Sequence, residues 1–330
     1  MGAGVIQLKR QVYTAVLAAG LLALLWLVLR DAERVMVASV GSAGPSPAPL
    51  TPLTGGAVLD GYGSWSPDGR EIAFMRTGQV WLISASGGEP RAVTQQEGFW
   101  DTVPVWHPKG GDIALIRLDP ETDQARVMLV NVRTGSEREL AHEKEPIGHL
   151  AWGPDGTHLY YTTSTRLMRL DVGRRRADTV LELSSDWEML AGGLAVSRDG
   201  RTAIFGAGPR TERGSVRYDL WRLPLDGGAA EPEQLTREGG IMPTLDSTGR
   251  RLIYRRPREE TGIYLMDLER HTTRQVVADE GGALYFHPRF SPDGKRLLVS
   301  RLLLKGAEHT SGTDRFTSHL YLSQLAAEAE

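Results

Sequence analysis

The side chains with the most chemical potential in this 330-residue sequence are two histidines and two carboxylates outside its apolar runs. His149 and His287 could transfer protons or bind a metal, and Asp101 and Glu188 could bind a basic group or assist hydrolysis. No motif supports them, because the chain has no Cys and no G-x-S-x-G, H-E-x-x-H, P-loop or EF-hand pattern. We therefore predict no catalytic residues, no metal site and no cofactor, and a protein that is not an enzyme.

A five-residue motif that would position these side chains recurs six times. Its clearest copies are residues 65–69 (WSPDG) and 290–294 (FSPDG), and the closing glycines are 41, 46, 44, 49 and 45 residues apart. Pro presets one φ angle of a turn, while Asp and Gly tolerate the next positions, so each copy is expected to join two antiparallel strands. The turn residues are Pro67, Asp68, Gly69, Gly110, Pro154, Asp155, Gly156, Asp199, Gly200, Gly249, Pro292, Asp293 and Gly294.

Each closing glycine is followed three residues later by a short apolar run, and then by further short strand-like segments. Four strands in a unit of about 45 residues are typical of a propeller blade. The sequence therefore predicts an all-β fold, a six-bladed β-propeller over residues 50–324 with a tail at 325–330. The sixth unit lacks a fourth strand, so we expect residues 50–54 to pair with residues 319–323 and close the ring.

The WSPDG repeat, with its trailing Leu-Thr strand and six copies, resembles the TolB-like family of six-bladed β-propellers across residues 50–324. TolB itself carries an additional α/β domain before its propeller, whereas this sequence has an apolar segment and a spacer there. The resemblance thus implies a propeller of that kind and not TolB proper, and TolB's partners are not implied. The repeat also resembles the propellers that precede hydrolase domains in prolyl-oligopeptidase-like enzymes.

In such a ring, the connections between second and third strands and between successive blades emerge on one face, which we call the mouth face. The repeated turns lie on the opposite face, the turn face. The mouth connections vary in length and carry aromatic and charged side chains, as binding loops on a rigid scaffold do. Trp100 and Trp187 are expected in loops there, and Asp101 or Glu188 would meet a basic group of a ligand. The predicted binding residues are Tyr62, Trp100, Asp101, His149, Trp187, Glu188, Met242 and His287.

These observations favour a binding or scaffold module for a protein or peptide partner, and we expect a monomer. The alternatives are a small-molecule hydrolase or lyase that uses carboxylates and His at the channel mouth, or a ligand-binding sensor domain. The formal net charge of −3 lacks the positive excess that a nucleic-acid binder needs, so no nucleic acid is expected.

The N-terminal region is predicted to anchor the protein. Residues 12–29 are apolar and uncharged; at about 1.5 Å per residue they reach about 27 Å, close to the roughly 30 Å hydrocarbon core. The following RDAER lacks the A-x-A-like pattern of small residues that signal cleavage requires. We expect residues 1–11 to be a short cytoplasmic tail, 12–29 a single transmembrane helix and 30–49 a Pro/Ser/Gly-containing spacer, with the propeller on the extracytoplasmic side of the cell membrane.

The full-length protein should therefore fractionate with membranes and keep its N-terminal segment. Cell fractionation and sequencing of the mature N-terminus measure this, and protease added to intact cells should digest the propeller. A mature N-terminus near residue 44 would identify a cleaved signal peptide instead. Protection of the propeller from the protease would reverse the expected orientation.

Overall fold

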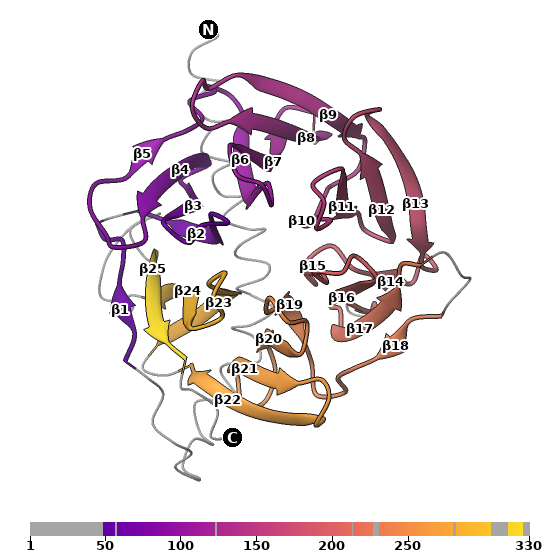
Figure 1. Ribbon diagram of the computed structural model, residues 1–330. Coiled ribbons are helices and arrows are strands. Elements are labelled where there is room, and N and C mark those ends of the chain that lie inside the picture. Colours follow the sequence, from indigo (N-terminus) through magenta and orange to yellow (C-terminus); the bar gives the residue numbers. More distant parts are fainter. Residues whose placement is uncertain are drawn as a thin grey trace, which may run out of the picture.

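The computed structural model describes residues 49–325, except 57, 123, 213, 227–230, 280–281 and 305–315. In these residues, 25 strands form six antiparallel sheets around a central axis (Figure 1). The predicted six-bladed β-propeller is confirmed. The predicted transmembrane segment, residues 12–29, lies outside the described residues, and no helix within those described is long and apolar enough to cross a membrane.

The first three blades each contain four strands, listed here from the axis outward. Blade 1 comprises β2 (Asp60–Trp65), β3 (Glu71–Arg76), β4 (Gln79–Ser84) and β5 (Arg91–Ala92). Blade 2 comprises β6 (Trp100–Trp106), β7 (Asp112–Asp119), β8 (Gln124–Asn131) and β9 (Glu137–Glu143). Blade 3 comprises β10 (Leu150–Trp152), β11 (His158–Thr162), β12 (Arg166–Asp171) and β13 (Arg176–Glu182).

The other three blades follow the same plan, with an extra short strand in blade 4. Blade 4 comprises β15 (Leu194–Val196), β16 (Thr202–Pro209), β17 (Asp219–Pro224) and β18 (Glu233–Gln234), and β14 (Trp187–Glu188) also pairs with β16. Blade 5 comprises β19 (Ile241–Leu245), β20 (Arg251–Arg256), β21 (Gly262–Asp267) and β22 (Thr272–Ala278). Blade 6 comprises β23 (Ala283–Phe290), β24 (Arg296–Leu304), β25 (Phe316–Gln324) and β1 (Thr51–Pro52).

The core lies between the faces of neighbouring sheets. The apolar run after each turn supplies its centre, because a strand flanked by sheets on both faces must be apolar on both. The first residue of this run is at most 1% exposed in all six blades: Ile72, Ile113, Leu159, Ala203, Leu252 and Leu297.

The turns have the predicted chemistry. All six closing glycines have φ between 69° and 77°, a region that favours glycine. Ser66 Oγ donates to Asp68 Oδ1 (2.6 Å) and accepts from the Glu71 backbone N–H (2.9 Å), which fixes the turn in blade 1. The same pair of side chains makes these bonds at Ser197 and Asp199, and at Ser291 and Asp293.

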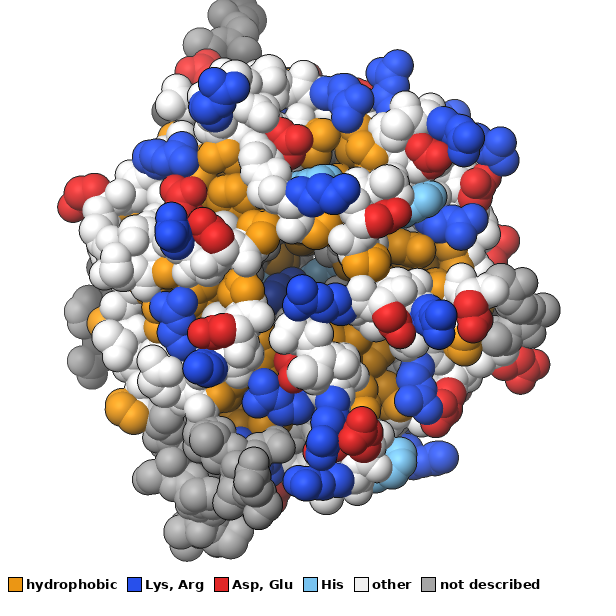
Figure 2. Space-filling model, viewed as in Figure 1, with side chains coloured by type: hydrophobic (Ala, Val, Ile, Leu, Met, Phe, Trp, Pro, Cys, Tyr) orange, Lys and Arg blue, Asp and Glu red, His pale blue; other side chains and the backbone are white. Residues whose placement is uncertain are grey.

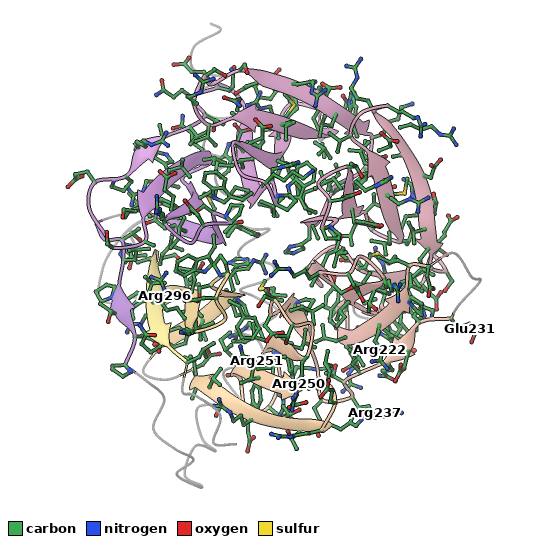
Figure 3. All side chains as sticks on the ribbon, viewed as in Figure 1. Arg222, Glu231, Arg237, Arg250, Arg251 and Arg296 are labelled. Carbon is green, nitrogen blue, oxygen red and sulfur yellow. The ribbon has the colours of Figure 1, made fainter. Side chains whose placement is uncertain are left out.

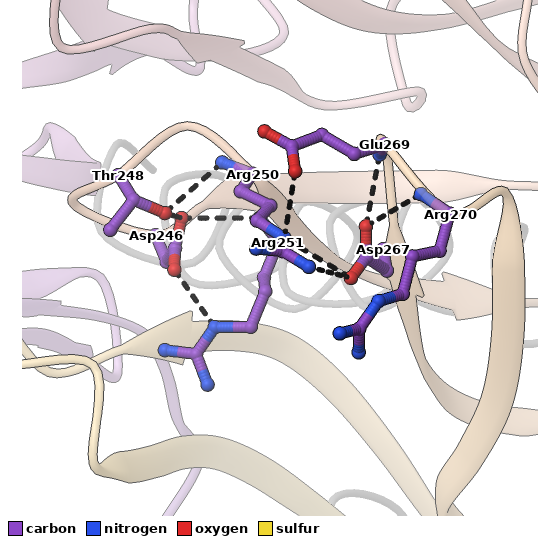
Figure 4. A network of polar contacts seen from close by, with 7 residues as sticks. All are labelled: Asp246, Thr248, Arg250, Arg251, Asp267, Glu269 and Arg270. Carbon is purple, nitrogen blue, oxygen red and sulfur yellow. Dashed lines mark hydrogen bonds and ion pairs between the residues drawn. The ribbon is translucent and has the colours of Figure 1, made fainter. Parts of the chain in front are cut away.

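Blade 5 keeps the turn although its sequence, LDSTG, exchanges the polar residues. Asp246 stands where blades 1, 4 and 6 have Ser, and Thr248 donates a hydrogen bond to it at 2.8 Å, so donor and acceptor have exchanged positions. Asp246 also accepts from Arg251 Nε at 2.8 Å. Arg250 and Asp267 extend this network along the turn face (Figure 4). The carboxylate therefore serves the same backbone geometry that a serine serves elsewhere.

A side chain from one blade also holds the turn of the next blade. The guanidinium carbon of Arg296 in blade 6 lies 4.5 Å from the ring centroid of Trp65 in blade 1, and Nη2 donates to the Gly69 carbonyl at 3.3 Å. Figure 3 shows Arg296 and its equivalent Arg251 on neighbouring blades. The equivalent contacts join Arg251 to Phe290 and Gly294, and His107 to Trp152 and Gly156.

Blade 6 is completed by the N-terminal strand, as predicted. Thr51 pairs with Leu322 and Pro52 with Tyr321, and the Leu53 N–H donates to the Leu320 carbonyl at 2.8 Å. The Leu320 N–H donates to Thr54 Oγ1 at 3.0 Å. Thr94 and Thr236 accept the equivalent bonds in blades 1 and 4, which explains the trailing Leu-Thr pattern.

Thr54→Val should lower the free energy of unfolding by about 1–3 kcal/mol, because it leaves the buried Leu320 N–H without a partner. Urea denaturation of the full chain measures the change. Thr51→Val is the matched control at an exposed position of the same segment, and should change stability by less than about 0.5 kcal/mol. Equal stability of the Thr54 variant and the wild type would contradict the closing role of this strand.

Candidate functional site

The innermost strands of four blades bulge at the same position of the repeat. Their pairing with the second strand shifts register there, and the bulged residue has a positive φ. Such values are uncommon for non-glycine residues, and a bulge redirects a side chain. The bulged residues are Tyr62 (55°), Val103 (48°), Met242 (56°) and His287 (50°).

Side chains from different blades meet at this level of the ring. The ring of Tyr62, in blade 1, lies 3.9 Å from that of His287 in blade 6 and 6.3 Å from that of His149, next to blade 3. Met242, in blade 5, accepts the His287 backbone N–H at its sulfur. Residues from blades on opposite sides of the ring can meet only near its axis. Figure 2 shows a hollow at the centre of the ring, with basic and histidine side chains in and around it.

Four of the predicted residues, Tyr62, His149, Met242 and His287, are thus brought together. Alignment of the repeats predicted that these residues lie at the same height along the axis, and their role in binding remains a prediction. The alignment missed Arg289, two residues beyond His287 in β23, because a charged residue near a turn usually faces solvent. We call Tyr62, His149, His287 and Arg289 the channel cluster.

The histidines of the channel cluster are neutral at pH 7. Burial, with a smaller contribution from Arg289, lowers the pKa of His149 to about 3. Burial and the neighbouring cationic groups hold the pKa of His287 well below its ordinary value. Neither ring nitrogen of His287 has a hydrogen-bond partner among the described residues. Burial also raises the pKa of Tyr62, so its phenol stays protonated.

Arg289 is the cation of the channel cluster. Its Nη1 donates to Thr244 Oγ1 (2.6 Å) and weakly to the Pro288 carbonyl (3.4 Å). Burial lowers its pKa to about 10, so it is charged at pH 7, and no described carboxylate contributes to that pKa. The other nearby cation, Arg255, is already paired with both oxygens of Asp279.

Asp101 lies in the interior instead of at the mouth surface. It is 2% exposed, and both of its oxygens accept from Arg117, at 2.7 and 2.8 Å. Glu137 binds the same guanidinium, so Arg117 is held on two sides. Asp60 and Arg76 form the equivalent pair in blade 1. Asp101 therefore ties two strands together, and its contact with a ligand remains a prediction.

Trp100 and Trp187 lie in strands, not in the loops that the sequence suggested. Trp100 begins β6 and packs on Gly78, at the tight turn of blade 1, where an added methyl group would come within 3.0 Å of the indole. Trp187 lies in β14 and meets Trp221 edge-on, with ring centroids 5.4 Å apart. Trp100 is thus explained by packing. Trp187 packs on the apolar cluster of Met189, Leu194 and Phe205 and stays half-buried there.

Trp187 and Trp221 line an open pocket of about 500 Å³ that spans blades 4 and 5 at the mouth face. We call this pocket the tryptophan groove. The neighbouring Glu188 accepts from Tyr218 at 2.8 Å and pairs with Arg210 at 2.8 Å. Figure 3 labels Arg237 beside this part of the ring. The charged side chains that line the groove are Arg217, Asp219, Arg237, Glu238, Arg258 and Glu259.

Comparison with solved structures finds the same architecture in other proteins. The structure of a putative TolB from Agrobacterium tumefaciens matches with a TM-score of 0.59 and 18% identity over 82% of this chain and 91% of that one. TolB from Acinetobacter baumannii matches with a TM-score of 0.55 and 17% identity over 81% and 63%. The fold is that of a TolB-like six-bladed β-propeller. An oligogalacturonate lyase in complex with manganese also matches, with a TM-score of 0.54 and 14% identity over 86% and 95%.

Sequence comparison finds further relatives at 23–28% identity, and no family model matches the chain. An uncharacterized peptidase, YuxL, of Bacillus subtilis is 28% identical over 34% of this chain, and dipeptidyl-peptidase 5 of Porphyromonas gingivalis is 26% identical over 36%. The matched segments span 24% and 19% of those relatives' lengths. The uncharacterized protein Atu1656 of Agrobacterium fabrum is 23% identical over 72% of this chain and 83% of its own length.

The channel histidines should make the fold sensitive to mild acid. An unfolded His takes up a proton below about pH 6.5, whereas His149 stays neutral in the folded protein down to about pH 3. Acid in this interval therefore favours unfolding, by about 1.4 kcal/mol per pH unit for each such His. His149→Gln should lose about 2 kcal/mol less stability than the wild type between pH 7 and pH 5, measured by urea denaturation.

Carboxylates titrate mainly below pH 5, so they contribute little to the difference in stability between pH 7 and pH 5. A wild-type slope in the His149 variant would show that His149 is protonated in the folded protein.

Proposed function

We propose that this protein is a binding or scaffold module for a protein or peptide, displayed by a membrane anchor at residues 12–29 on the extracytoplasmic side. The tryptophan groove supports this proposal most directly. Two indole rings form an apolar surface that charged side chains of both signs surround. Trp and Arg are enriched at the centres of protein interfaces, where each contributes a large share of the affinity.

The shape of the groove favours an extended segment over a compact ligand. It is open to solvent and continues from blade 4 onto the connections of blade 5. Glu238 is fixed by Arg256 at 2.8 Å, so this part of its rim is preorganised. A polypeptide could lay an apolar side chain against the two indoles and satisfy its polar groups along such a rim.

The acidic side chains nearest the mouth favour binding over hydrolysis. Asp60 and Asp101 each hold an arginine with both oxygens, and Glu188 is engaged by Arg210 and Tyr218. A general acid or base must reach the proton that it transfers. Carboxylates held in this way serve the framework of the blades.

The second candidate function is a small-molecule hydrolase or lyase. The channel cluster favours it, because two neutral histidines, a tyrosine and an arginine converge there. The structural likeness to an oligogalacturonate lyase shows a related fold and leaves the reaction open. Turnover of a small ester, lactone or uronate by the purified full chain, lost in His287→Gln, would favour this candidate.

Trp187→Ala should weaken peptide binding by about 2 kcal/mol or more, a roughly thirtyfold rise in Kd, because it removes one of the two indoles that line the groove. Peptides selected from a random twelve-residue library on the full chain serve as probes, and fluorescence anisotropy measures Kd.

Asp68→Ala on the turn face is the control, and should cost a little stability without changing Kd. Circular dichroism of both variants shows whether the ring is intact. Normal binding by folded Trp187→Ala, with binding lost in folded Asp68→Ala, would place the functional face on the opposite side.

A further inference from the structure

The channel cluster forms a second recognition site, separate from the tryptophan groove. We propose that it binds one small carboxylate anion, with Arg289 as the charged partner and His287 and Tyr62 as hydrogen-bond donors. The site lies near the axis at the level of the strand bulges, where blades 1, 3, 5 and 6 meet.

The first argument is the unused hydrogen-bonding capacity of His287. The residue is 8% exposed, and both ring nitrogens lack a partner in the described part of the chain. A buried polar group without a partner costs free energy, and such groups in native proteins call for an explanation. Ser300 adds to the case, because its buried hydroxyl is also unpartnered there and lies on the same side of Gly61 as His287 Nδ1.

The second argument is charge. Arg289 carries one positive charge, and no described carboxylate forms an ion pair with it. Arg255 is neutralised by Asp279, and the histidines are uncharged. The cluster therefore has one unbalanced positive charge in a poorly solvated place. A monoanion balances it, whereas a dianion such as phosphate would leave a negative charge there.

The third argument is geometry. Arg289 uses Nη1 for its contacts with Thr244 and Pro288, which fixes the plane of the guanidinium. Its Nη2 and Nε have no hydrogen bond to a described carboxylate. A planar fork of N–H donors matches the two oxygens of a carboxylate. The neutral His287 ring then donates one N–H, and the Tyr62 hydroxyl, which stays protonated, donates another.

The bulges supply the positioning. Tyr62 and His287 both reach the axis from backbone conformations with positive φ, at 55° and 50°. Backbone strain of this kind costs free energy and is concentrated at active sites and ligand sites. Four blades share the distortion, so the ring as a whole holds these side chains in place.

The test uses the full chain labelled with ¹⁵N at its histidine rings, titrated with sodium acetate at pH 7 and constant ionic strength. Acetate should cause saturable shifts of the His149 and His287 resonances, and acetamide, its neutral isostere, should cause none. Arg289→Gln should weaken acetate binding at least about tenfold, because it removes the charged partner. Arg222→Gln, at an exposed ion pair in blade 4, is the matched control and should bind as the wild type does.

Tyr62→Phe keeps the ring and removes only the donor, so it tests the site even if the Arg289 variant does not fold. It should weaken acetate binding several-fold. A peptide with a free terminal carboxylate that competes with acetate, where its C-terminal amide does not, would identify a peptide as the source of the carboxylate. Failure of that peptide to compete would assign the site to free small carboxylates.

Three results would overturn the proposal: equal effects of acetate and acetamide, wild-type affinity in both folded channel variants, or binding of phosphate without binding of acetate. Trp187→Ala should leave acetate affinity unchanged. Loss of peptide binding at the tryptophan groove and loss of carboxylate binding in the channel are therefore separate outcomes.

Discussion

Closure of the ring is the constraint on which the rest of this structure depends. An apolar strand in each blade needs a sheet on both of its faces, and blade 1 is covered on one face by blade 6, whose outer edge β1 completes. Thr54 binds the N-terminal segment to β25 within blade 6. Arg296 of blade 6 lies over the ring of Trp65 in blade 1 and so joins the two blades. Because β23 belongs to this blade, closure also sets the place of His287 and Arg289. The channel cluster is therefore a product of long-range pairing, not of local sequence.

Much of the fold could be predicted because its signals are local. Each turn is specified within five residues that end in a glycine of positive φ, and blade 5 keeps the turn without Pro because Asp246 and Thr248 exchange the donor and acceptor roles. Alignment of these turns also placed Tyr62 and His287 at one level. Other features depend on partners far along the chain. Asp101 is buried because Arg117, sixteen residues away, neutralises it, and Trp187 is in a strand because it pairs with Pro209.

The two proposed sites use the scaffold in different ways. The tryptophan groove lies at the mouth face, where connections differ between blades, and its chemistry can vary without disturbing the ring. The channel cluster is built from the innermost strands, where each bulged residue is packed by neighbouring blades. A substitution there alters the packing shared by several blades. We therefore expect channel variants to affect stability and ligand binding together, and variants of the charged groove residues to affect mainly binding.

Packing nevertheless joins the two sites. Tyr218 binds Glu188 beside the tryptophan groove and packs in one apolar cluster with Met242, whose sulfur accepts the His287 N–H. Contact of this kind does not by itself couple two sites, because coupling needs an element with two arrangements that both ligands bias. Met242 is held by its own N–H bond to the Gly192 carbonyl at 2.7 Å and by the close approach of Gly193 to its backbone. Because its backbone is held in this way, Met242 has little room for a second arrangement. We therefore expect the peptide at the tryptophan groove and the carboxylate at the channel cluster to bind independently.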